Sequence, residues 1–259
     1  MTEPAPGYRR VSFDHPPVNL MDARTAEELT SLVDGLESDD TVKVVVFDSA
    51  NPDFFLARYD FSAGGLPSQA GPTGLPPFLD LTTRLSRLPI VSVAAIRGRA
   101  RGGGSEFALA CDLRFASDNA ILGQPEVGTG LLPAGGGIER LTQLVGRSRA
   151  LEIVLSADDF DAETAQRYGW ITRVLPDAEL DGFVDRLARR LAGFDRPVLA
   201  AAKRLIGRRT APSADDLLET QAAVAELIRQ PSFAARFAAV REAARAAGPD
   251  FELRLGRHL

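Results

Sequence analysis

Two short runs of almost uninterrupted apolar residues most constrain the fold of this chain. They cover residues 42–47 and 90–96, and each is followed by a loop rich in glycine and then by a helical pattern. Such a run predicts a strand that is buried on both faces of a sheet. A strand–loop–helix unit therefore occurs at 42–85 and again at 90–110. This order indicates an α/β fold built of stacked ββα-like turns.

Glycine and proline concentrate in residues 52–77, which carry no apolar period. We predict that this stretch is an active-site loop followed by a mobile segment.

From about residue 135 the pattern changes from strands to helices. Apolar residues recur there at three- and four-residue steps, and the last three predicted helices cover 198–208, 214–229 and 232–246. Their Ala-rich faces are typical of close helix packing. We therefore predict a core domain over residues 1–196 and a C-terminal helical oligomerisation region over 197–259.

Histidine and cysteine are scarce, which limits the chemistry that the chain can perform. His15, His258 and Cys111 are the complete set, so disulfide scaffolds and zinc fingers are excluded. A catalytic triad would have to recruit one of two histidines near opposite ends of the chain. We therefore expect no metal site.

Charge and hydropathy also argue against several partners. Lysine and arginine total 30 against 35 acidic residues, a net charge of −5, whereas a dedicated nucleic-acid binder normally needs a basic surface. The apolar runs are far shorter than the roughly 20 residues that span a bilayer. We expect a cytoplasmic protein that binds neither nucleic acid nor membrane.

Three consecutive glycines, Gly102 to Gly104, stand between a predicted strand and a predicted helix. Backbone N–H groups at a helix N-terminus can bind developing negative charge, although a tight packed turn would also need such a run. Phe107 occupies the place of the last glycine in both the dinucleotide-binding and the serine-hydrolase motifs. The residue therefore excludes both of those motifs.

Two glutamates lie near this glycine run in the sequence. Glu106 falls in the first turn of the predicted helix, where an acid also compensates the helix dipole. Glu126 follows in a predicted loop, where a carboxylate can simply be solvated. Together with the glycines, they form a candidate acid–base pair facing an anion-binding site.

Five segments resemble the landmarks of the enoyl-CoA hydratase/isomerase (crotonase) family, in the same order and at similar spacing. The resemblance covers about residues 10 to 230. The segments are 16–20 (PPVNL), 54–60 (FFLARYD), 102–112 (GGGSEFALACD), 123–126 (GQPE) and 132–137 (LPAGGG).

The family resemblance implies a crotonase-like spiral of ββα units with a C-terminal helical region. It also implies assembly as a homotrimer or as a dimer of trimers. The implied substrate is an acyl-CoA thioester, so coenzyme A enters as part of the substrate and no separate cofactor is expected.

The family's site residues can be carried over by position. Its two oxyanion-hole donors fall on the backbone N–H groups of Tyr59 and Gly103, and its two hydratase glutamates fall on Glu106 and Glu126. Keeping both glutamates favours addition of water to a 2-enoyl-CoA. We assign Glu106 as the base toward water and Glu126 as the proton donor to the α-carbon. The expected contacts to CoA are Arg24, Ala57, Arg58, Asp60 and Gly102.

Three positions depart from the family pattern. Arg58-Tyr59 replaces a usual Gly-Ala, Arg101 replaces an apolar residue, and Ala134 replaces a glycine. These departures indicate a divergent subgroup whose substrate differs from a plain short fatty enoyl-CoA. Isomerisation, thioester hydrolysis and C–C cleavage stay open as alternative reactions, as does a non-catalytic protein that binds acyl-CoA.

Overall fold

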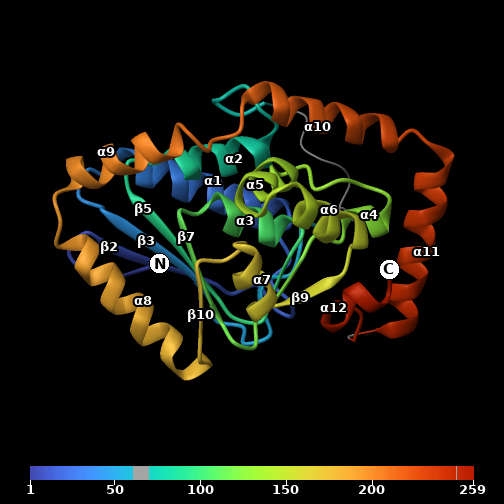
Figure 1. The fold of residues 1–259 in the computed structure, drawn as a ribbon, viewed down its shortest axis with the longest axis horizontal. Helices are drawn as coiled ribbons and strands as arrows, with labels where there is room; N and C mark the ends of the chain where they lie inside the picture. Colours follow the sequence, from blue (N-terminus) through green and yellow to red (C-terminus); the bar gives the residue numbers. More distant parts are fainter. Residues whose placement is uncertain (61–69, 249) are drawn as a thin grey trace.

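The strands form two sheets whose strand order follows a spiral (Figure 1). The computed structural model describes residues 1–60, 70–248 and 250–259. The mobile segment expected within 52–77 therefore falls largely outside the described residues. The six-stranded sheet has the order β1 (Thr2–Ala5), β2 (Tyr8–Phe13), β3 (Val44–Ser49), β5 (Val91–Ile96), β7 (Leu113–Ser117) and β10 (Arg173–Leu175). The four-stranded sheet has the order β4 (Phe54–Leu56), β6 (Arg99–Arg101), β8 (Ile121–Gly123) and β9 (Asp159–Asp161).

Each turn of the spiral contributes one strand to each sheet and then a helix. The three turns are β3–β4–α2 (Pro77–Arg87), β5–β6–α3 (Gly103–Ala110) and β7–β8–α4 (Glu126–Thr129). The strands that successive turns contribute pair in parallel, whereas β1 on β2 and β9 on β8 pair antiparallel. The predicted α/β spiral of ββα units is confirmed.

Several local predictions need correction. The segment expected as a glycine loop contains β6, and the loop expected after residue 52 contains β4. The strand expected at 42–47 runs from Val44 to Ser49, and Glu126 begins the one-turn helix α4 instead of lying in a loop. Strands of three residues are too short to show a period, so their pairing comes from neighbouring turns of the spiral.

Aromatic packing in the core fixes where α3 begins. Phe107, on α3, packs edge-to-face against Phe47 of β3 with ring centroids 5.0 Å apart, and against Phe13 of β2 at 5.5 Å. Phe55 meets Phe13 at 5.3 Å from the adjacent sheet. Such pairs stabilise a core beyond the area they bury. They anchor the glycine-rich start of α3 beside β4.

Helices cover the spiral and continue past it. The predicted C-terminal helical region is present, since α9 to α11 run around the edge of the molecule and α12 returns toward β9 (Figure 1). Among the described residues, no helix is both long and apolar enough to cross a membrane. The helices outside the three turns are α1 (Ala23–Ser38), α5 (Gly137–Val145), α6 (Arg147–Ser156), α7 (Ala162–Tyr168), α8 (Asp177–Ala192), α9 (Arg196–Gly207), α10 (Ala214–Leu227), α11 (Pro231–Ala247) and α12 (Asp250–Leu253), followed by a 3₁₀ turn over Leu255–Arg257.

Candidate active site

A cavity of about 350 Å³ is lined by the starts of α3 and α4 and by the loop after β4. Glu106, Glu126, Tyr59 and Gly103 all line it, so the structure brings together the four residues expected to carry the chemistry. Most of the other lining residues are apolar. The other lining residues are Pro76, Pro77, Phe78, Leu79, Leu131, Leu132, Ala134, Gly135, Gln221, Val224, Ile228, Phe233 and Phe237, of which Gln221 is polar.

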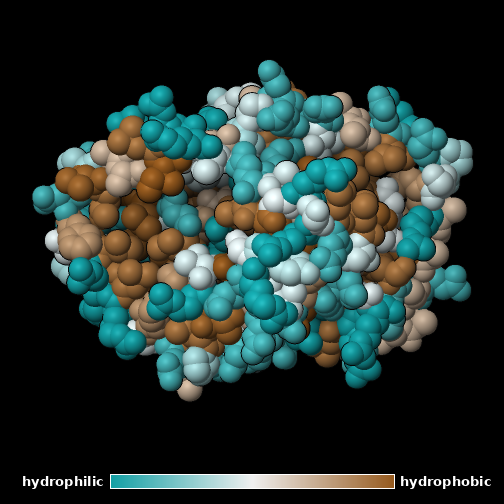
Figure 2. Space-filling view, in the orientation of Figure 1, coloured by the Kyte–Doolittle hydropathy of each residue, from teal (hydrophilic) through white to brown (hydrophobic). Residues whose placement is uncertain are grey.

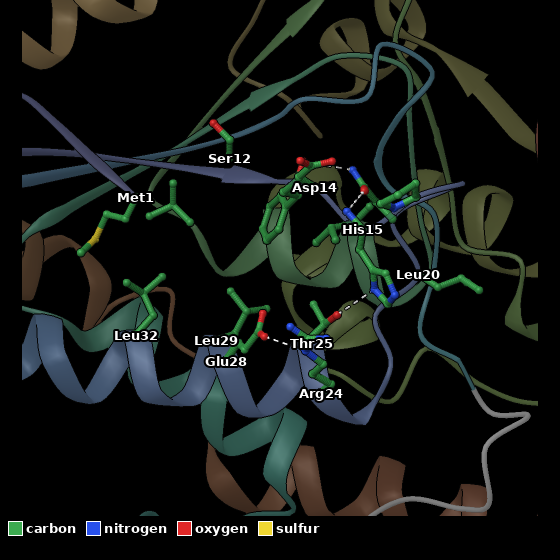
Figure 3. A pocket seen from close by; sticks show the side chains of 15 residues that line it. Met1, Ser12, Asp14, His15, Leu20, Arg24, Thr25, Glu28, Leu29 and Leu32 are labelled. Atoms are coloured by element: carbon green, nitrogen blue, oxygen red, sulfur yellow. Dashed lines mark hydrogen bonds and ion pairs between the residues drawn. The ribbon is translucent and has the colours of Figure 1, made fainter.

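A second hollow, of about 540 Å³, is larger but lies elsewhere. Figure 3 shows it between the end of β2 and α1. Arg24 and His15 line it, with His15 hydrogen-bonded to Thr25 at 3.1 Å. Neither Glu106 nor Glu126 lines this hollow, so the smaller cavity is the candidate active site.

The glycine run at the start of α3 is required because the backbone turns sharply there and lies very close to Tyr59. Gly102 has φ of +49°, which permits the sharp turn from β6 into the helix. A β-carbon on Gly103 would lie 2.9 Å from Tyr59 Cβ and 3.1 Å from Tyr59 N. The absence of side chains there lets the two backbone segments lie against each other.

The loop that carries Tyr59 is held by the segment around Asn19. The Asn19 side chain donates to the carbonyls of Phe54 and Phe55 at 3.1 and 3.2 Å. Two residues after Asn19, Met21 makes two backbone hydrogen bonds to the same loop. Its N–H donates to the carbonyl of Arg58, and its carbonyl accepts from the N–H of Asp60, both at 2.9 Å.

These two hydrogen bonds form a parallel β-bridge between Met21 and Tyr59, and the bridge decides which way the Tyr59 N–H and C=O point. In a parallel bridge, one residue makes both hydrogen bonds, to the two neighbours of the residue opposite, whose own N–H and C=O point to the other side. Here Met21 makes both bonds, and Tyr59 is the residue opposite. Met21 and Tyr59 form such a bridge, and Gly103 lies against Tyr59 N. Gly103 is the first residue of α3, and the first N–H groups of a helix have no acceptor within it. The two backbone donors therefore lie side by side at the cavity.

Glu106 is buried, with 4% of its surface exposed. Its Oε1 accepts hydrogen bonds from Gly135 N at 2.7 Å and Gly137 N at 2.9 Å. Burial raises the pKa of Glu106 to about 7, although these two N–H groups and the guanidinium of Arg140 oppose the rise. The side chain can therefore exchange a proton near neutral pH.

Glu126 is also buried, with 8% exposed, at the first position of α4. Its Oε1 lies against Gly102, where a β-carbon would collide with it. Its Oε2 has no hydrogen-bond partner among the described residues. Burial, and then the charge of Glu106, raise the pKa of Glu126 well above its ordinary value. Two carboxyl groups in one dry cavity disfavour double ionisation, and these environments favour the proton on Glu126.

The expected CoA contacts fall in two places. Ala57, Arg58 and Asp60 flank Tyr59, and Gly102 lies beside Glu126. Arg24, in contrast, lines the second hollow with its side chain 83% exposed and paired with Glu28.

Two of the three departures from the family pattern are arginines that make internal contacts. Arg101 is 1% exposed and forms a two-point ion pair with Asp159, with both N···O distances 2.6 Å. Arg58 donates to Glu252 Oε1 at 2.7 and 3.1 Å. The third departure, Ala134, lines the cavity, and its carbonyl accepts from Gln221 at 2.6 Å.

Sequence reasoning missed the far wall of the cavity. The C-terminal helices, expected only to pack against other helices or subunits, supply side chains from α10 and α11 to this wall. Phe233 and Phe237 stack with ring centroids 5.5 Å apart. Their four-residue spacing was visible as a helical stripe, but the surface that the stripe faces was not.

The comparisons with known proteins agree with this geometry. The sequence model for "Enoyl-CoA hydratase/isomerase" matches residues 7–234. A short-chain-enoyl-CoA hydratase of Clostridium acetobutylicum is 32% identical over 196 residues, which cover 74% of each protein. The fatty acid oxidation complex subunit alpha of Idiomarina loihiensis is 35% identical over 207 residues, 77% of this chain and 29% of that longer protein.

Solved structures show the same relationship. A crystal structure from Streptomyces avermitilis, provisionally assigned as an enoyl-CoA hydratase, superposes with a TM-score of 0.88 at 42% identity. The match covers 97% of this chain and 92% of the other. With the family model spanning most of its length, this chain belongs to the enoyl-CoA hydratase/isomerase family.

Proposed function

We propose that this protein adds water to the C=C bond of a 2-enoyl-CoA thioester. One observation carries the proposal: two buried carboxyl groups, of Glu106 and Glu126, line one cavity with the adjacent backbone donors of Tyr59 and Gly103. Hydration of a conjugated thioester needs charge stabilisation at the carbonyl oxygen, a base for water and an acid for the α-carbon.

The thioester oxygen accepts hydrogen bonds from Tyr59 N–H and Gly103 N–H. Attack of water on the β-carbon pushes electrons onto this oxygen, so the intermediate is enolate-like. Donors fixed before the reaction begins stabilise that charge without reorganisation, and each contributes about 10²–10³ in rate.

The two glutamates divide the proton transfers. Glu106, whose Oε1 is held by two backbone N–H groups, accepts a proton from water as the water oxygen bonds to the β-carbon. Glu126, which burial keeps protonated, donates its proton to the α-carbon. The proton then passes from Glu106 back to Glu126 and restores both groups. The raised pKa of each residue supports this division.

The cavity walls favour an apolar acyl group, since most of the residues that line them are apolar. The CoA portion lies outside, and we keep Arg24, Ala57, Arg58, Asp60 and Gly102 as its proposed contacts. CoA is part of the substrate, and the proposed reaction uses no separate cofactor.

We also propose that the chain assembles as a homotrimer or a dimer of trimers in the cytoplasm. Exposed apolar side chains on α9 support self-association, and the surface between α8 and α9 is largely apolar (Figure 2). Val198 and Ile206 are examples from α9.

A panel of 2-enoyl-CoA thioesters tests the reaction. Hydration removes the absorbance of the conjugated thioester and yields a product heavier by one water. A product that is a 3-enoyl isomer, free CoA or a shortened acyl-CoA would contradict hydration, and so would the absence of turnover across the panel.

A further inference from the structure

The carboxyl-terminal helix α12 contacts both arms of the proposed oxyanion hole through one residue, Glu252. The Glu252 side chain accepts two hydrogen bonds from Arg58, next to Tyr59. The Glu252 backbone carbonyl accepts one from Arg101 Nη1 at 2.5 Å. Arg101 ends β6, two residues before Gly103. Glu252 therefore touches the segments that carry the two backbone donors.

The link from Glu252 to Tyr59 runs through a single guanidinium. Arg58 Nη2 donates to Glu252 Oε1 at 2.7 Å, while Arg58 Nη1 donates to the carbonyl of Tyr59 at 3.3 Å. An arginine side chain is long and flexible, and a carboxylate partner restricts its orientation. Glu252 thus restrains the guanidinium that holds the Tyr59 carbonyl, in addition to the bridge between Met21 and Tyr59.

Contacts other than the Glu252 carboxylate also hold α12 in place. Phe251 and Leu255 are buried on either side of it, and the neighbouring carbonyl of Leu253 accepts from Arg99 at 2.9 Å. Arg101, held by Asp159, donates to the Glu252 carbonyl and not to its side chain. Loss of the carboxylate charge would leave these contacts intact.

The environment of the carboxylate also calls for an explanation. Its side chain is 14% exposed, and Oε2 has no hydrogen-bond partner among the described residues. A mostly buried charge with an unpartnered oxygen is costly for stability. The ion pair with Arg58 is the side-chain contact that the fold retains at this cost.

We propose that Glu252 is a positioning residue for the oxyanion hole. Through Arg58 it holds the Tyr59 carbonyl and so complements the bridge to Met21, and through its own carbonyl it ties that arm to the strand that leads into Gly103. The inference rests on the proposed function, because it assumes that these two donors bind the thioester oxygen.

Kinetics of four variants test the role. Glu252→Gln keeps the shape and removes the charge, and we expect kcat to fall about tenfold with KM changed less than about threefold, because small misplacement of a catalytic group slows the reaction step. Arg58→Gln should lower kcat similarly, and the double variant no further than Arg58→Gln alone. Asp250→Asn, an exposed charge change in the same helix, is the matched control with wild-type kcat.

A spectroscopic probe separates positioning from folding. In a cinnamoyl-CoA with a para-dimethylamino group, absorption moves to longer wavelength as the thioester oxygen accepts stronger hydrogen bonds. We expect wild type and Asp250→Asn to shift the bound probe fully and Glu252→Gln to shift it less, with thermal unfolding monitored for each protein.

The outcomes distinguish this inference from the proposed function. Equal shifts and equal kcat in wild type and Glu252→Gln would overturn the positioning role alone. A wild-type protein that shifts the probe but hydrates no enoyl-CoA would contradict the proposed reaction. The positioning role would then be decided by the probe alone: a smaller shift in Glu252→Gln supports it, and an equal shift refutes it. Failure of the wild type to shift the bound probe would contradict the oxyanion hole and, with it, this inference.

Discussion

The carboxylate of Glu106 accepts a hydrogen bond at 2.7 Å from the backbone N–H of Gly135, just before α5. The carbonyl of the same glycine accepts from buried Arg140 at 3.1 Å. A side chain that is held by backbone donors cannot rotate freely, so one oxygen is fixed and the other is left for the cavity. The segment before α5 thereby orients the proposed base.

Replacing either glutamate by glutamine should stop hydration while substrate still binds. We expect kcat to fall by about 10²–10⁴ for Glu106→Gln and for Glu126→Gln, the usual contribution of a general acid or base. Steady-state hydration rates and the affinity for a non-reactive acyl-CoA check this. Residual activity above about a tenth of wild type in either variant would remove that residue from the mechanism.

The pH dependence of the rate follows from the two environments. The base must be ionised, so kcat/KM should fall as pH drops below about 7, the pKa of Glu106. The acid must be protonated, so the rate should fall again at alkaline pH, because burial raises the pKa of Glu126. Since the two groups interact, the two apparent pKa values read from the acidic and alkaline limbs of the pH–rate profile are properties of the pair.

Variants assign the limbs of that profile. The residual activity of Glu106→Gln should lack the acidic limb, and that of Glu126→Gln the alkaline limb. Loss of the same limb in both variants would contradict the division of roles.

The pair of buried Arg101 and partly buried Asp159 should matter mainly for stability. Asp159→Asn leaves a buried guanidinium with a weaker partner, and we expect a loss of about 3 kcal/mol in the free energy of unfolding. Denaturant unfolding measures it. Glu28→Gln, which breaks the exposed pair with Arg24, is the control and should cost less than about 0.5 kcal/mol.

Chain-length preference should depend on the wall supplied by the C-terminal helices. Ile228 lines the cavity but is partly exposed, so Ile228→Trp can narrow the cavity without disturbing the core. We expect kcat/KM for long enoyl chains to fall about tenfold more than for short ones, the effect of a few methylene groups in an apolar pocket.

A matched variant controls for the added indole. Leu218→Trp changes a similarly exposed position on α10 that does not line the cavity. It should leave the preference unchanged. The same chain-length profile in both variants would show that Ile228 does not contact the acyl group.

Much of the fold and the centre of the site could be predicted from local patterns. The apolar runs at 42–47 and 90–96 predicted β3 and β5, and the glycine run predicted the start of α3. The three-residue strands β4 and β6 could not be predicted, because neither contains enough residues to show a period. The interpretation of α10 and α11 as packing helices missed the cavity that they line, since a helical stripe shows that a face is apolar but not what it faces.

The sequence by itself determined the two long buried strands, the sharp turn into α3 and the C-terminal helices, since period and glycine placement act within a few residues. It also determined, through resemblance, that Glu106 and Glu126 belong to one site. Only the tertiary structure decided the partners of the two unusual arginines. Arg101 meets Asp159 across 58 residues and Arg58 meets Glu252 across 194. A charge in a sequence carries no information about which opposite charge the fold will bring to it, because that pairing depends on how the helices close around the spiral.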